Sequence, residues 1–168
     1  TASSAFSDTS TVINLPNRRN FTRAGNEGSN VTGHMLQRGA SYSLPAPAYG
    51  RPTGEVLRTQ GTAFDFSAPL LLGDALAADD EQLRQFGGFD HNLVADGLGF
   101  RKIATPQEPE SGRIMDVMTD LPGVQLYTMH TARELSGNQG AVYSTWRALC
   151  PEPPTFPHAA HLPRLRPP

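Results

Sequence analysis

The sequence is short of cysteine, of basic charge and of long apolar runs. Cys150 is the single cysteine among 168 residues, which excludes an internal disulfide and fits a reducing, cytoplasmic location. We expect it to be a small buried hydrophobe. The net charge of −2 lacks the basic excess that nucleic acid or an anionic membrane surface would require. No apolar run approaches the roughly 20 residues that cross a bilayer, and no signal-like segment opens the chain.

What the sequence has instead is many turn residues, with 15 prolines and 16 glycines. Short strands separated by such turns are typical of an all-β protein, so we predict one antiparallel β-sandwich domain over residues 1–168. Strands are predicted at 11–15, 31–37, 62–66, 89–94, 100–105, 113–119 and 124–128, and one helix at 75–86 that ends at Gly87.

Three segments are predicted to lie outside the regular sheet. Residues 1–10 are rich in Ser and Thr and are expected to be loose. Residues 43–53 are expected to cross the surface in an extended form. The prolines of 147–168 argue against a strand there, so 151–168 is expected to be a Pro-rich tail.

Two predicted strands carry polar side chains that an apolar strand does not need. Asp90 lies in the 89–94 strand, and Gln125 shares one face of the 124–128 strand with Tyr127. Carboxylate and amide groups can each hold two hydroxyl groups, so these side chains suit a ligand rich in hydroxyls. For Asp90 the alternative is a cap on the preceding glycine turn.

These stretches resemble the second half of the aldose 1-epimerase, or galactose mutarotase, family. The blocks that carry the resemblance are, in chain order, Val12–Gly25, Pro52–Glu55, Gly61–Phe66, GGFDHN at Gly87–Asn92 and EPESGRIMDVMTDLPGVQLYT at Glu108–Thr128. It extends from about Thr11 to Pro157. It implies a β-supersandwich with a sugar cleft on its concave face, of which this chain holds an incomplete part. The implied ligand is a small sugar such as galactose or glucose, with neither a cofactor nor a metal.

The family interconverts the α and β anomers of an aldose by opening its ring, with a Glu as base and a His as acid. The resemblance places Glu152 at the base position, four residues before Phe156. Pro154 and His158 depart from the family pattern, and the alternative is a solvated Glu in a Pro-rich tail. The resemblance also implies sugar-binding roles for Asp90 and Gln125.

The acid position holds an unexpected residue. Asn17, Phe21 and Gly25 match the family's Asn-His-x-x-Phe-Asn-Leu-x-Gly run, but Arg18 stands where the His belongs. A guanidinium has a pKa above about 12 and cannot give up a proton at neutral pH, although it could stabilise developing charge. The match makes Asn17 a further candidate for sugar binding.

The histidines that remain are expected to be surface or structural residues. They are His34, His91, His130, His158 and His161. His130 directly follows the Gln125 strand, and there it replaces an Asn of the family while Met129 replaces a Gly.

Three functions stay open at this point. The chain could be a mutarotase-type isomerase, a carbohydrate-binding β-sandwich that has lost the acid, or a structural subunit. Family members are about twice as long, and their first half carries an Asn-Arg pair and a second His. We therefore expect either a fragment of a longer protein or a half that pairs with a partner chain. If the site works, we expect Asp90, Gln125 and Glu152 to converge on one hollow.

Overall fold

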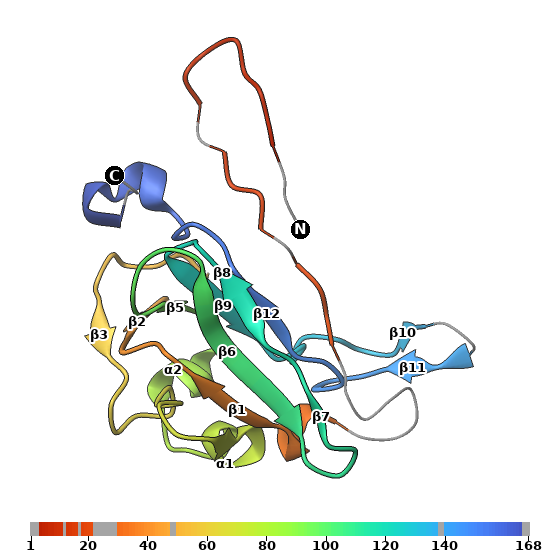
Figure 1. Cartoon of the computed structure of the whole chain (residues 1–168). Coiled ribbons are helices and arrows are strands. Elements are labelled where there is room, and N and C mark those ends of the chain that lie inside the picture. The colour runs from red at the N-terminus through yellow and green to blue at the C-terminus, as the bar shows by residue number, and fades with distance from the viewer. Residues whose placement is uncertain are drawn as a thin grey trace.

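A computed structural model describes residues 4–11, 13–16, 18–21, 30–47, 50–137 and 140–165 (Figure 1). The strands are β1 (Met35–Arg38), β2 (Tyr42–Leu44), β3 (Leu57–Arg58), β4 (Leu70–Leu71), β5 (Asp90–Val94), β6 (Arg101–Glu108), β7 (Arg113–Ile114), β8 (Val117–Thr119), β9 (Gly123–Tyr127), β10 (Leu135–Ser136), β11 (Val142–Tyr143) and β12 (Cys150–Glu152). The helices are α1 (Leu72–Leu76) and α2 (Glu81–Phe86), with 3₁₀ turns η1 (Val31–Gly33), η3 (Ala159–His161) and η4 (Pro163–Leu165).

The strands form two five-stranded sheets and one separate hairpin, and every pair is antiparallel. The first sheet has the order β4-β1-β6-β7, with β8 also paired to β6, and the second has the order β12-β9-β5-β2-β3. The hairpin β10–β11 extends away from both sheets (Figure 1). The predicted antiparallel, all-β class is confirmed.

The core lies between the two sheets. One cluster of buried residues joins Leu36 and Ala104 of the first sheet to Leu93 and Leu126 of the second. Since successive side chains of a strand point to opposite faces, the residues next to Leu93 and Leu126 point away from this core. That outward face of the second sheet carries the polar side chains discussed below.

The single helix predicted at 75–86 is wrong, because the chain forms two shorter helices. Asp80 has an extended backbone, which interrupts the helix, and its side chain accepts hydrogen bonds from the Gln82 and Leu83 amides as the N-cap of α2. Gly87 ends α2 in the left-handed conformation with φ of 73°, as predicted.

The strand predicted at 62–66 is also wrong. This segment forms turns, and the alternating Phe64 and Phe66 are both buried in the core without belonging to a strand. A period of two therefore identified two buried side chains but not their backbone conformation. The described residues of 11–15 form no strand either, and they are exposed.

Two other predicted strands are divided. The first part of 31–37 is η1 and only the second part enters β1, while 113–119 separates into β7 and β8. Residues 43–53 are less superficial than predicted, since Ser43 and Leu44 belong to β2 and are buried.

The main correction concerns the Pro-rich end of the chain, where β12 pairs with β9. Pro151 lies within β12. This is possible because β12 is last in the strand order of its sheet, and on its other side only an isolated bridge at the neighbouring Leu149 is formed, so the missing N–H of Pro151 breaks no ladder. No helix within the described parts of the chain is long and apolar enough to span a bilayer.

Candidate functional site

The outward face of the second sheet brings polar residues from three neighbouring strands into one row. Gln125 flanks the core residue Leu126 on β9 and therefore points away from the core. The register places Gln125 opposite Glu152 on β12 and also opposite Asn92 on β5. A carboxylate and two carboxamides thus stand side by side across the sheet.

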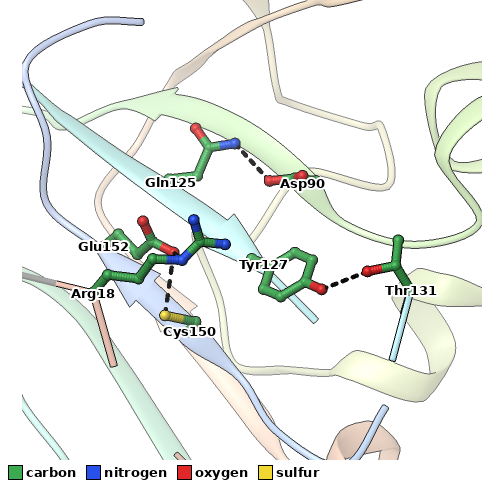
Figure 2. A network of polar contacts seen from close by, with 7 residues as sticks. All are labelled: Arg18, Asp90, Gln125, Tyr127, Thr131, Cys150 and Glu152. Atoms are coloured by element: carbon green, nitrogen blue, oxygen red, sulfur yellow. Dashed lines mark hydrogen bonds and ion pairs between the residues drawn. The ribbon is translucent and has the colours of Figure 1, made fainter. Parts of the chain in front are cut away.

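A second row lies one step along the same strands. Tyr127 on β9 is opposite Cys150 on β12 and Asp90 on β5. The two rows are joined by a hydrogen bond, in which Gln125 Nε2 donates to Asp90 Oδ1 at 2.9 Å (Figure 2). The hydrogen bond to Gln125 therefore holds the Asp90 carboxylate on this outward face.

Glu152 is held by two further side chains. Its Oε1 accepts from Arg18 Nε at 2.9 Å and from the Cys150 thiol at 3.3 Å (Figure 2). The Glu152 side chain is 9% exposed, whereas that of Arg18 is 64% exposed. Glu152 is therefore not a solvated side chain of a trailing tail, which was the alternative interpretation.

Arg18 reaches this carboxylate because of a backbone bridge. Phe21 and Leu149 exchange both amide hydrogen bonds at 2.8 Å as an antiparallel pair. Counting three residues along each chain from this bridge places Arg18 opposite Glu152. The guanidinium carbon of Arg18 also lies 5.6 Å from the centre of the Tyr127 ring, a distance at which a cation interacts favourably with an aromatic ring.

The thiol of Cys150 stays protonated beside Glu152. Burial, followed by the hydrogen bond to Glu152 and the charge of Glu152, raises the pKa of Cys150 to about 12. The protonated thiol is what donates to the carboxylate. Cys150 is fully buried, as predicted, and it also helps to fix the orientation of Glu152.

Asn92 is a candidate that the sequence analysis missed. It is 2% exposed, and neither its Oδ1 nor its Nδ2 has a hydrogen-bond partner among the described residues. Gln125 Oε1 is likewise buried without a described partner. Buried amides normally find partners, so this face retains unused hydrogen-bonding capacity. The sequence could have indicated Asn92, because it stands two residues after Asp90 and both side chains therefore lie on one face of β5.

Four of the five predicted site residues lie together. Arg18, Asp90, Gln125 and Glu152 occupy one face (Figure 2), while Asn17 lies outside the described residues.

Two hollows of the described surface lie away from this cluster. One of about 820 Å³ is bordered by 13–15, β8 and Pro151, and one of about 80 Å³ lies near β2 and α2. Neither is lined by Asp90, Gln125 or Glu152, so neither is the common hollow expected for these three side chains. Within the described part of the chain, no three His, Cys, Asp or Glu side chains are grouped closely enough to hold a metal.

Comparison with known proteins relates the chain to one family, by a family profile and by individual relatives. The sequence profile of the family described as Aldose 1-epimerase matches residues 1–166. The chain is 37% identical to galactose mutarotase of Homo sapiens over 159 residues, covering 94% of this chain and 45% of that protein. It is 29% identical to aldose 1-epimerase of Escherichia coli K12, covering 90% of this chain and 44% of that protein.

Solved structures resemble the chain in the same way. Galactose 1-epimerase from Lactobacillus acidophilus NCFM superposes with a TM-score of 0.71 at 26% identity, covering 87% of this chain and 41% of that chain. An aldose epimerase homologue from C. elegans has a TM-score of 0.75 at 22% identity, which shows the shared fold, with 90% of this chain and 45% of that chain covered. The chain thus spans less than half the length of these proteins.

Proposed function

This chain belongs to the aldose 1-epimerase family, and on that premise we propose that its outward polar face binds an aldohexose and supports interconversion of the α and β anomers. The observation that carries the proposal is the register of β12, β9 and β5, which brings Glu152, Gln125 and Asp90 onto one face. Because the relatives are about twice as long, the proposal includes further polypeptide that completes the sugar cleft, and the exchange measurements below are made with that polypeptide present.

In this proposal Asp90 and Gln125 bind the sugar. The carboxylate accepts from hydroxyl groups, and the amide both donates and accepts, so together they can hold neighbouring hydroxyls of a ring. Their mutual hydrogen bond at 2.9 Å orients both groups before a ligand arrives. Gln125 Oε1 is buried and has no hydrogen-bond partner among the described residues, so its accepting capacity is not used within this part of the chain.

Glu152 serves as the base of the proposed reaction. It removes the proton from the anomeric hydroxyl while the bond between C1 and the ring oxygen breaks and an acid protonates the ring oxygen. After rotation about C1–C2 both proton transfers reverse as the ring closes. The Cys150 thiol and the Arg18 guanidinium both bond to Oε1, which leaves Oε2 as the oxygen for proton transfer. Arg18 stabilises negative charge at this site but cannot exchange a proton at neutral pH.

A second function is favoured by the ion pair between Arg18 and Glu152. Because the guanidinium binds the carboxylate at 2.9 Å, it competes with a sugar hydroxyl for the same group. The alternative proposal is a protein that binds carbohydrate on this face without catalysing the reaction.

Two NMR measurements on one sample with galactose separate the two proposals. Magnetisation exchange measures the rate at which the anomers interconvert, and saturation transfer detects binding of the sugar. Wild-type protein should accelerate exchange, and Glu152→Gln should reduce the acceleration by about 10²–10⁴-fold, the usual contribution of a positioned base. Glu110→Gln is the matched control, since Glu110 is exposed on the turn after β6.

Equal rates for wild-type and Glu152→Gln protein would remove the role assigned to Glu152. Binding of galactose without accelerated exchange in the wild type would favour the second function.

A further inference from the structure

His130 lies at the end of the polar face, next to residues of its second row. The centre of its ring is 5.3 Å from the centre of the Tyr127 ring, in an edge-to-face arrangement. Tyr127 is the register partner of Asp90. The Asp90 carboxylate is close enough to raise the pKa of His130 against the larger effect of burial. The imidazole of His130 thus packs against the tyrosine that pairs with a proposed sugar-binding residue.

The backbone around His130 fixes the position of its ring. Met129, which follows β9 and precedes His130, has a left-handed φ of 53°, which is unfavourable for a non-glycine residue. The Met129 carbonyl accepts from the amides of Ala132 and Trp146, both at 3.3 Å, and these bonds hold the turn.

Gly88 provides the space that His130 needs. A Cβ atom at Gly88 would lie 2.7 Å from His130 Cβ and 2.8 Å from its Cγ, closer than such atoms approach. The glycine thus allows the chain before β5 to pass directly against the histidine. Close packing and a constrained turn are both typical of side chains that are held in place for a task.

The imidazole also has unused hydrogen-bonding capacity. Its Nδ1 is buried and has no hydrogen-bond partner among the described residues. Burial lowers the pKa of His130, and Asp90 and the Phe89 backbone oppose this effect. The other titratable neighbours are His91, with which it interacts electrostatically, and Tyr127, whose ring also lies under the Arg18 guanidinium.

We propose that His130 is the proton donor of this site and takes the role for which Arg18 is unsuited. This inference rests on the proposed mutarotase function. Glu152 takes the proton of the anomeric hydroxyl, the C1–O5 bond breaks as the C1 carbonyl forms, and the protonated His130 imidazolium gives its proton to O5 and becomes neutral. After rotation about C1–C2, O5 attacks C1, its proton returns to His130, and Glu152 returns a proton to O1. No other reactant is required.

Among the other histidines, His91 adjoins Asp90 in the chain, and its Nδ1 accepts from the Asp90 amide at 3.1 Å. His34 and His91 are each 1% exposed, and the His91 ring packs against aromatic rings behind the sheet. His158 and His161 lie together at η3, with ring centres 4.7 Å apart. His130 is thus the imidazole that the fold brings next to Tyr127, the register partner of Asp90.

The test compares His130→Gln with the wild type and with His158→Gln, using galactose exchange NMR between pH 4.5 and 8. Gln keeps a side-chain N–H that can serve a structural hydrogen bond, but it cannot titrate. We expect His130→Gln to lose about 10²-fold in exchange rate, while saturation-transfer binding of galactose changes less than about threefold. The wild-type rate should fall as the pH rises through the lowered pKa of His130, and this fall should be absent in the variant. His158→Gln should behave as the wild type.

Two results would overturn the role of His130 while leaving the proposed function intact. One is a His130→Gln rate within about threefold of the wild type, and the other is a pH profile of His130→Gln equal to that of the wild type. Both count only if Glu152→Gln is inactive, which shows that the catalytic function itself is present. A wild type without accelerated exchange would instead refute the catalytic function itself, and with it this inference.

If His130→Gln does not fold, the wild type still provides a test. Galactose should shift the ¹⁵N resonances of the His130 ring and its titration midpoint. Unchanged His130 resonances, with shifts at Asp90 and Gln125, would overturn the proposal.

Discussion

The ion pair between Arg18 and Glu152 gives the most direct test of how this face is assembled. The informative change is Arg18→Gln, which removes the charge and keeps a polar side chain of similar length. Glu152 then retains only the Cys150 thiol as a described side-chain donor. We expect a less stable protein, because a carboxylate that is 9% exposed loses its cation.

The magnitude follows from the unequal exposure of the two partners. Breaking a fully buried pair costs about 3–5 kcal/mol, whereas exposed pairs are worth about 0.2–1 kcal/mol. Since the Arg18 side chain is 64% exposed, solvent screens the pair and we assign about 1 kcal/mol. Loss of the contact with the Tyr127 ring adds about 0.5 kcal/mol. For a chain of this size the total corresponds to a fall in Tm of about 3–6 °C.

A double-mutant cycle isolates the pair. Unfolding in urea is measured for the wild type, Arg18→Gln, Glu152→Gln and the double variant, and the coupling energy should be about 1 kcal/mol. In 1 M NaCl it should fall by more than half, because the Debye length shortens to about 3 Å. Arg19→Gln is the control, since Arg19 borders the separate 820 Å³ hollow. A coupling within about 0.3 kcal/mol of zero, or one unaffected by salt, would refute the geometry described for Arg18.

Two further predictions concern buried ionisable groups. Burial first, and His130 second, lower the pKa of His91 to about 4. In the unfolded chain the His91 imidazole takes up a proton near pH 6.5. The free energy of unfolding should therefore be highest above that pH and should decrease by about 3 kcal/mol as the pH falls to 4. His91→Leu should weaken this dependence in urea titrations and His158→Gln should not, whereas an unchanged slope in His91→Leu would contradict it. Arg38 is 4% exposed, and its guanidinium nitrogens lack hydrogen-bond partners among the described residues. Arg38→Met should therefore raise the free energy of unfolding by about 1–4 kcal/mol. A loss of stability would contradict this, because it would show that the folded chain stabilises the Arg38 charge.

Local sequence patterns predicted those parts of the fold whose cause is local. The strand around Asp90 and the strand around Gln125 were predicted within one or two residues, because alternation of apolar side chains is a property of neighbouring positions. Gly87 was predicted to end a helix for the same kind of reason, since it supplies the left-handed conformation.

Long-range pairing accounts for the elements that were missed. Pro151 argues against a strand unless that strand lies at an edge, and only the completed sheet places β12 there. Phe64 and Phe66 alternate in sequence, yet they reach the core from a turn, because packing needs only their burial. The division of the helix depended on whether Asp80 would lie within it or cap a new one.

The sequence by itself determined the family, the antiparallel β class and the residue types available for binding hydroxyl groups, because motifs and periodicity are written along the chain. Only the tertiary structure decided that Arg18 bonds to Glu152, that Asn92 is buried without a described partner, and that His130 lies beside Tyr127. These contacts join segments far apart in the chain, or depend on a strained turn, so their geometry exists only once the strands have paired.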